Sequence, residues 1–401
     1  MKDATQPSLT ANLPTDWTFG DLWNEALLSR ESRPIQPRSR IWASELGKAP
    51  VDIFLKLKGE EPTNPPDARS LRKFEAGNIW EWIVKLVLMR AGVLRATQER
   101  VEYQYPGLLP VTGKLDHLAG GLPDYERAKE ELERLGLPDV FNRAFESIVT
   151  FLQKEYPHGL GDKVLEVKSV SSFMFDGMEK SGKSSANHRK QLFHYLKGKN
   201  MPRGDIIYIC RDDCRMMQIP IINPSPVEDE YRKDIEIISG YFSRDEQPPI
   251  EKLLVFDEDL GKFSRNFNVA YSGYLTKLYG FKNQGEYEDI YRPMSERFNR
   301  VLRRGKKAEA RALWLREQGV AEDQVQKELV VVEGKKARQA FYFIKKDEEK
   351  VPLPDDIKSG FELSKDNLET ISEMEKLGFS FGECVRKAPE EVEEDEVIVT
   401  E

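Results

Sequence analysis

The chain has few of the residues from which cysteine and histidine sites are built. Its 401 residues include three cysteines, Cys210, Cys214 and Cys384, and four histidines that do not cluster. An odd, low cysteine count argues against a disulfide scaffold. Three thiols also cannot supply the four thiolates of an iron–sulfur cluster or a four-cysteine zinc site. A bound metal is therefore expected on carboxylates, and no iron–sulfur cluster is expected.

Long apolar runs and an apolar leader are also missing. The longest apolar stretch, residues 83–89, is interrupted by Lys85 and is too short to cross a bilayer. Residues 1–6 are polar and lack the apolar core of a signal peptide. We expect a cytoplasmic protein with no membrane partner.

A net positive charge is absent as well. The formal net charge is −8, with 39% hydrophobic and 32% charged residues, which is typical of a globular protein with a highly charged surface. This balance excludes a strongly basic nucleic-acid-binding protein. It leaves room for a local basic groove on an acidic protein.

Composition and periodicity divide the chain into four parts. An N-terminal lead-in (residues 1–39) is rich in Pro, Ser and Thr, and a core (40–248) alternates helical and strand patterns. A C-terminal extension (249–388) is expected to be helical and charged, and a Glu-rich tail (389–401) is expected to be disordered.

The core predicts an α/β fold with a mixed central sheet flanked by helices. One helix is expected at residues 70–91, on one side of the sheet, and another at 185–199, where it would close the site. A helical insertion is expected at about 123–157.

Three chemically informative residues lie on two strand-like segments. Asp116 belongs to the segment at 109–118, and Glu166 and Lys168 belong to the segment at 163–170. Because side chains alternate along a strand, Glu166 and Lys168 share one face. If Asp116 projects from a neighbouring strand, two carboxylates and an amine converge.

Such a set suits phosphodiester hydrolysis. Carboxylate oxygens hold Mg²⁺ or Mn²⁺ with waters still bound, and the ion lowers the pKa of a water and polarises a phosphoryl oxygen. The carbonyl of Val167 can complete the metal shell. Lys168 can orient or deprotonate the attacking water and stabilise negative charge.

Two helices carry further candidates. On the 70–91 helix, Glu81 lies among largely apolar neighbours. On the 185–199 helix, Gln191 and Tyr195 share one face while Leu192 and Leu196 face the core. The basic run of His188, Arg189 and Lys190 is expected to contact phosphates, and the alternative is a solvated basic turn.

Five short motifs occur in one order along residues 40–222, about half of the chain. Together they resemble the PD-(D/E)XK nuclease superfamily, and within it the RecB-like and lambda-exonuclease-like branch. The motifs are Ser44-Glu45-Leu46, Gly77-Asn78-Ile79-Trp80-Glu81, Gly113-Lys114-Leu115-Asp116, Glu166-Val167-Lys168-Ser169 and Gln191-Leu192-Phe193-His194-Tyr195.

The resemblance implies a restriction-endonuclease-like core and a role for each matched residue. Asp116 and Glu166 would ligate Mg²⁺ or Mn²⁺, and Glu81 would be a further ligand, directly or through water. Lys168 would act on the attacking water. Gln191 and Tyr195 would position the DNA strand and the lysine. The implied activity is that of a deoxyribonuclease, with an exonuclease in recombination, repair or phage DNA processing favoured over an endonuclease.

The chain departs from the family in two ways, and two other functions stay open. Some relatives clamp the fold with four cysteines around an iron–sulfur cluster, which this chain cannot do. The insertion at 123–157 is long and could gate the site, so strand polarity does not transfer. The protein could instead be a non-cleaving nucleic-acid-binding module, or an adaptor that meets a protein partner through its C-terminal region of about 150 residues.

Overall fold

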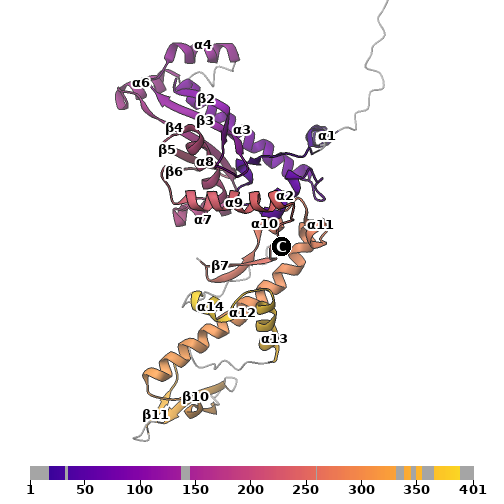
Figure 1. Ribbon diagram of the computed structural model, residues 1–401. Coiled ribbons are helices and arrows are strands. Elements are labelled where there is room, and N and C mark those ends of the chain that lie inside the picture. The colour runs from indigo at the N-terminus through magenta and orange to yellow at the C-terminus, as the bar shows by residue number, and fades with distance from the viewer. Residues whose placement is uncertain are drawn as a thin grey trace, which may run out of the picture. The chain divides into compact units, whose positions relative to one another are not determined.

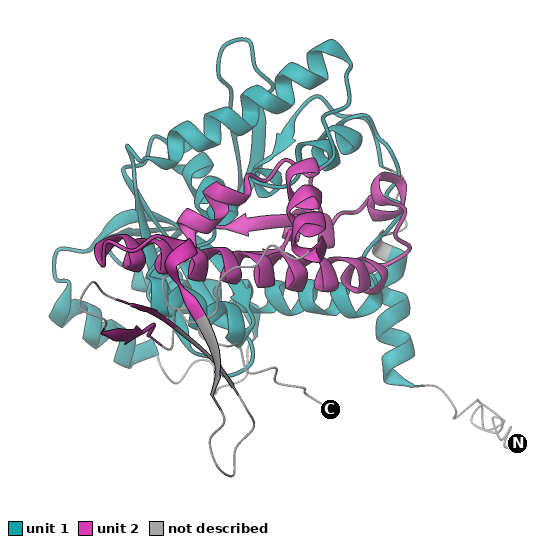
Figure 2. Ribbon diagram, turned by 90° about the horizontal axis from the view of Figure 1, so that it is seen from below, with its two compact units in different colours: residues 1–250 teal, residues 251–401 magenta. Residues whose placement is uncertain are grey.

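The computed structural model describes residues 18–31, 35–136, 145–258, 260–330, 338–344, 349–354 and 365–388. The chain forms two compact units, residues 1–250 and 251–401 (Figure 2). The composition of the sequence changes at 248/249, and the units divide at 250/251. The acidic tail at 389–401 lies outside the described residues.

Unit 1 is built on a mixed six-stranded sheet, which confirms the predicted α/β class. The strands pair in the order β1-β3-β4-β5-β6, and β2 also pairs with β3. The β1–β3 and β4–β5 pairs are parallel and the other pairs are antiparallel. The strands are β1 (Ile41–Trp42), β2 (Leu94–Tyr103), β3 (Val111–Gly121), β4 (Leu160–Val170), β5 (Arg203–Cys210) and β6 (Met216–Ile222).

Helix α3 (Ala68–Arg90) covers one face of this sheet (Figure 1). Its Trp80, Val84 and Leu88 pack against a cluster that includes Leu165, Val167 and Ile207 of β4 and β5. The apolar side chains that recur along its other side, Phe74, Ile79, Ile83 and Val87, are exposed. Leu71, Leu86 and Met89 of α3 are buried as well, so the helix is anchored on more than one side.

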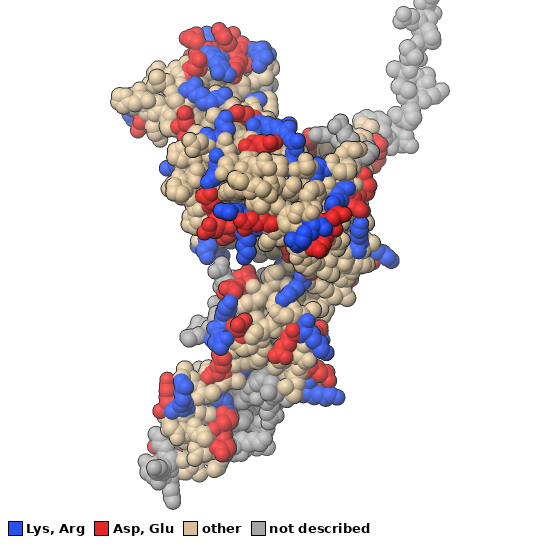
Figure 3. Space-filling model, in the orientation of Figure 1, with Lys and Arg blue, Asp and Glu red and all other residues tan. Residues whose placement is uncertain are grey.

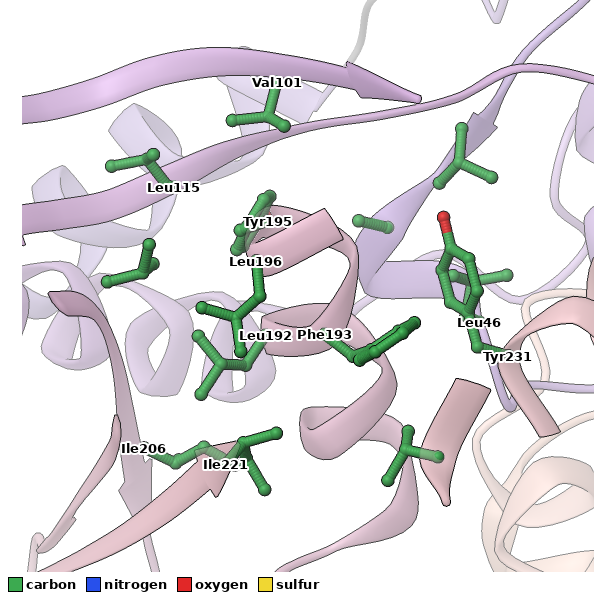
Figure 4. Packing of buried hydrophobic residues seen from close by; sticks show 14 of the residues in the cluster. Leu46, Val101, Leu115, Leu192, Phe193, Tyr195, Leu196, Ile206, Ile221 and Tyr231 are labelled. Carbon is green, nitrogen blue, oxygen red and sulfur yellow. The ribbon is translucent and has the colours of Figure 1, made fainter. Parts of the chain in front are cut away.

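Helix α8 (Ala186–Lys199) covers the opposite face and is itself covered by α9 (Val227–Arg244). Figure 4 shows Leu192, Phe193 and Leu196 of α8 packed among side chains of the sheet and Tyr231 of α9. All residues from Lys190 to Leu196 are buried. The predicted face bearing Gln191 and Tyr195 is thus enclosed rather than open to solvent, because Tyr195 packs against β3 at Gly113.

The remaining helices of unit 1 include one within the N-terminal lead-in, at 19–31, for which no helix was predicted. Its start carries a signal that sequence reasoning missed: the Asp21 amide donates to Thr18 Oγ1 at 3.1 Å, and Thr18 Oγ1 donates to Asp21 Oδ2 at 2.6 Å. The helices are α1 (Phe19–Glu31), η1 (Ala43–Glu45), α2 (Pro50–Leu57), α4 (Tyr125–Leu135), α6 (Phe145–Glu155) and α7 (Ser172–Ser181).

The insertion at 123–157 contains α4 and α6, and both lie at the end of unit 1 near β2 and β3 (Figure 1). Residues 137–144, between these two helices, lie outside the described part of the chain.

Unit 2 has its own core, in which Phe263, Phe298 and Met374 are fully buried. It is helical as expected but also contains a two-stranded and a three-stranded sheet. The elements of unit 2 are β7 (Leu254–Asp257), β8 (Lys262–Arg265), α10 (Phe267–Ala270), α11 (Leu275–Tyr279), α12 (Gln284–Glu317), η2 (Glu322–Gln324), β9 (Gln326–Val330), β10 (Arg338–Ile344), β11 (Lys350–Pro352), α13 (Lys365–Lys376) and α14 (Phe381–Lys387).

No described helix in either unit is long and apolar enough to cross a membrane.

Candidate active site

A gap in strand pairing forms the frame of the candidate site. One edge of β3 is paired along its length by β2. The other edge is paired first by β1, up to Trp42↔Thr112, and then by β4, starting at His117↔Leu165. Among the described strands none pairs with residues 113–116 on this edge. Asp116 is the last residue of the gap.

The side chain of Asp116 replaces the missing strand pairing. Its Oδ2 accepts a hydrogen bond from the backbone N–H of Val167 at 2.8 Å, where the β3–β4 ladder would otherwise continue. The N–H and C=O of one residue face the same edge of a strand. The Val167 carbonyl therefore also faces β3, on the side where Asp116 lies.

Glu166 is fully buried, and only one of its two carboxylate oxygens has a hydrogen-bond partner. Its Oε1 accepts a hydrogen bond from Lys168 Nζ at 2.6 Å, and its Oε2 is buried with no hydrogen-bond partner within the described structure. A buried carboxylate oxygen without a donor is costly, and such an atom calls for an explanation such as a missing ion. The orphaned Oε2 therefore fits a bound cation.

The two carboxylates and the lysine set one another's charge. Burial, followed by the nearby Glu166 carboxylate, raises the pKa of Asp116 well above its ordinary value. Burial likewise raises the pKa of Glu166. Burial alone would lower the pKa of Lys168, but the Glu166 and Asp116 carboxylates outweigh it and the pKa of Lys168 is raised. Lys168 is thus an ammonium group held between two acids.

This donor set suits a hard divalent cation. The carboxylates of Asp116 and Glu166 and the carbonyl of Val167 supply only oxygen atoms, as Mg²⁺ and Mn²⁺ prefer. Within the described ranges, no three His, Cys, Asp or Glu side chains form a ready-made metal cage. Protein oxygens would therefore fill part of the coordination shell, and water the rest.

Glu81 is predicted as a further metal ligand, and the structure places it outside the Asp116–Glu166 pair. Its carboxylate accepts a hydrogen bond from the side-chain amide of Gln98. Its charge still reaches the site, because it contributes to raising the pKa of both Asp116 and Glu166.

Gln98 is a site residue that sequence reasoning missed. It lies on β2 between the paired positions Thr97↔His117 and Glu99↔Leu115, and so faces Asp116 across the ladder. Its φ is +53°, a left-handed conformation that costs a non-glycine residue about 1 kcal/mol or more. No motif marks a strained glutamine within a strand, so only the structure reveals it.

Tyr195 and Gln191, predicted to position DNA and the lysine, lie buried behind the carboxylates. The Gln191 amide donates to the Tyr195 hydroxyl at 3.2 Å. A Cβ on Gly113 would lie 2.8 Å from the Tyr195 ring and hydroxyl, so the glycine of one motif makes room for the tyrosine of another. Burial, followed by the Glu166 charge, raises the pKa of Tyr195 and keeps its hydroxyl protonated.

The basic run at the start of α8 does not form an open phosphate-binding face. Lys190 is buried and pairs with Asp234 of α9 at 2.8 Å. His188 Nδ1 lies 2.9 Å from the Tyr208 hydroxyl, and burial, followed by nearby Lys168, lowers the pKa of His188 to about 3. Arg189 donates to a backbone carbonyl of the preceding loop. The ion pair of Lys190 and the low pKa of His188 therefore do not favour the predicted phosphate contacts of these two residues.

Comparisons with known proteins give only distant similarity. No protein-family model and no curated protein sequence matches the chain. Among solved structures, the chain is similar to SSO0001, with a TM-score of 0.35, 15% identity, and coverage of 58% of this chain and 89% of that one. It is also similar to the alkaline exonuclease LHK-Exo from Laribacter hongkongensis, with a TM-score of 0.31, 12% identity, and coverage of 56% and 93%. The same exonuclease in complex with dAMP gives a TM-score of 0.32 at 13% identity, with coverage of 56% and 93%.

Proposed function

We propose that the protein is a metal-dependent nuclease that hydrolyses DNA phosphodiester bonds. The observation that carries the proposal is the buried carboxylate pair at the β3–β4 gap, with the orphaned Oε2 of Glu166 beside the ammonium of Lys168. A binding module would have no use for a buried carboxylate oxygen that lacks a donor, because it only destabilises the fold. A metal site uses that atom directly.

Each residue has a role in this proposal. Asp116, Glu166 and the Val167 carbonyl would hold Mg²⁺ or Mn²⁺. When bound, the ion supplies a lowered water pKa and charge stabilisation at the phosphoryl oxygens. Lys168, as an ammonium, would orient the attacking water and stabilise negative charge rather than take up a proton. Glu81, held by Gln98, would act through solvent.

The finer proposal is an exonuclease acting on DNA ends in recombination, repair or phage DNA processing. Its support is the order of the five motifs, from Ser44 to Tyr195, and the contact between Gly113 and Tyr195 that joins two of them. The buried positions of Gln191 and Tyr195 support a positioning role for both, behind the carboxylates.

The test is cleavage of linear and circular DNA, single- and double-stranded, with Mg²⁺, Mn²⁺ or EDTA. We expect metal-dependent degradation of linear DNA, survival of circular DNA, and a loss of about 10²–10⁴-fold in Lys168→Ala, the usual range for a positioned catalytic group. Lys154→Ala, which changes an exposed lysine on α6, is the matched control and should cleave like wild type. DNA binding without cleavage under every metal would contradict the nuclease proposal and leave the non-cleaving binding module.

A further inference from the structure

A groove runs between α3 and β2 toward the insertion helix α4. It consists of two adjoining hollows of about 400 and 190 Å³ that share Trp82, Lys85 and Thr97 in their walls. The first hollow reaches the residues around Glu81, and the second reaches α4 at Arg134. We name it the α3–β2 groove.

One end of the α3–β2 groove opens beside the candidate active site. Gln98 lines the first hollow and faces Asp116 across the β2–β3 ladder. His117, which also lines it, follows Asp116 in β3, and its Nε2 lies 3.2 Å from the Glu81 carbonyl oxygen. The groove therefore ends at the residues that lie next to Asp116 on β3 and opposite it on β2.

Three cations in the walls, Lys85, Arg95 and Arg134, form no ion pair within the described structure. Within the described residues, neither Lys85 nor Arg134 forms an ion pair with an acid. The Arg95 guanidinium donates to the backbone carbonyls of Gly120 and Leu122, both at 2.8 Å, which leaves its charge uncompensated. The groove therefore attracts an anion.

The excess of positive charge is confined to the α3–β2 groove. The chain has a net charge of −8, and on the face shown in Figure 3 basic and acidic side chains are interspersed. Of the acids that line the groove, Glu131 is paired with Arg127 at 3.0 Å and Glu81 is held by Gln98. Three cations thus outweigh a single unpaired carboxylate along its length.

Trp82 distinguishes among anionic ligands. Its side chain is 44% exposed and lies in both hollows beside Lys85. An exposed aromatic ring among cations that follow a groove is the combination that binds single-stranded nucleic acid, in which a base stacks on the ring and phosphates meet the cations. A base pair in an intact duplex is already stacked and cannot use the ring in this way.

We propose that the α3–β2 groove binds one single strand of nucleic acid and leads it to the site at Asp116. A base stacks on Trp82, and phosphates contact Lys85, Arg95 and Arg134. The inference rests on the proposed function for the destination of the strand. The binding itself requires no catalysis.

The test is fluorescence anisotropy of a labelled oligothymidylate with the full chain in EDTA. We expect Trp82→Ala to weaken binding about 5- to 100-fold, the range found for single base–aromatic stacks, and Trp82→Phe to recover most of it. Lys85→Gln should reduce the slope of log affinity against log salt by about 0.7, the share of one phosphate on a single strand. The matched controls are Phe173→Ala, an exposed aromatic on α7, and Lys129→Gln on α4, and both should bind like wild type.

The outcomes separate this inference from the proposed function. If cleavage depends on Lys168 but Trp82→Ala and Lys85→Gln bind the strand like wild type, the groove is not the strand-binding site, and the nuclease proposal stands. Binding that depends on Trp82 and Lys85, with no cleavage under any metal, overturns the nuclease and leaves the groove. A wild-type chain that does not bind the oligonucleotide, or that prefers a blunt duplex, overturns the groove as a single-strand site.

Discussion

At the scale of single residues, the site holds two carboxyl groups in surroundings that disfavour their ionised forms. Asp116 is 8% exposed and Glu166 is fully buried, and each lies in the field of further negative charge. Lys168 compensates one oxygen of Glu166 and leaves the other without a partner. Such strain persists when the surrounding structure enforces it, and it is typical of functional sites.

Asp116→Asn should stabilise the metal-free protein and remove its response to metal. The raised pKa of Asp116 means that its ionised form is unfavourable in the fold at neutral pH, whereas an amide keeps an oxygen for the Val167 N–H. We expect the melting temperature in EDTA to rise by about 2–4 °C, as ~1 kcal/mol does in a domain of this size. Mg²⁺ should raise the melting temperature of wild type only. A variant that melts below wild type in EDTA would contradict this account.

At the scale of elements, Gly113 allows α8 to pack closely against β3, because it has no side chain in the space that Tyr195 fills. Because a Cβ at Gly113 would also lie 3.0 Å from Ala43 Cβ, the backbone of β3 has no room to take up a larger residue. The contact joins the strand that carries Asp116 to the helix that carries Tyr195. It explains in physical terms why these two motifs occur together.

Gly113→Ala should therefore destabilise unit 1 and weaken cleavage together. Overpacking of this kind typically costs about 1–3 kcal/mol, and the shift of Tyr195 would disturb the carboxylates in front of it. Urea unfolding and the cleavage assay measure the two effects. Gly161→Ala, on β4 with nothing within 4 Å of the new Cβ, is the matched control and should leave both unchanged. Equal behaviour of the two variants would show that the Gly113–Tyr195 contact is dispensable.

At the scale of the whole molecule, every proposed site residue lies in unit 1, and unit 2 has a core of its own. A fragment of residues 1–250 is therefore expected to retain metal-dependent cleavage of DNA. The measurement is the same cleavage assay on the fragment and the full chain, with circular dichroism to check folding. A folded but inactive fragment would move the function toward residues 251–401 and favour the adaptor.

Buried neutral histidines make the stability of the whole chain depend on pH. Burial lowers the pKa of His117 and His194 to about 4, whereas an unfolded histidine titrates near 6.5. Between these values the unfolded chain binds protons that the folded chain does not, so this contribution to stability is lost as the pH falls from about 6.5 to 4. The raised pKa values of Asp116 and Glu166 act in the opposite direction, so a variant is needed to isolate one histidine.

His194→Gln should flatten the pH dependence in that window by about 1.4 kcal/mol per pH unit, the share of one proton. Urea unfolding in EDTA at several pH values measures it. His158→Gln changes an exposed histidine and should leave the slope as in wild type. An unchanged slope in His194→Gln would contradict a neutral buried His194.

Much of this protein could be predicted from local sequence. Alternation marks β4 and places Glu166 and Lys168 on one face, and helical spacing marks α3 and α8, because these patterns depend only on backbone periodicity. Composition argued against sites that need four thiolates and pointed to oxygen ligands. The capping pair Thr18 and Asp21 at the start of α1 is an equally local signal.

Tertiary structure alone decided how these elements meet. The gap at residues 113–116 exists because β1 and β4 share one edge of β3. The enclosure of α8 depends on α9, which is separated from α8 in the chain by the strands β5 and β6. The ion pair of Lys190 with Asp234 and the strained Gln98 opposite Asp116 arise from the same long-range packing. Periodicity predicts which face a side chain takes, but the partner on that face is set by chain segments far away in the sequence.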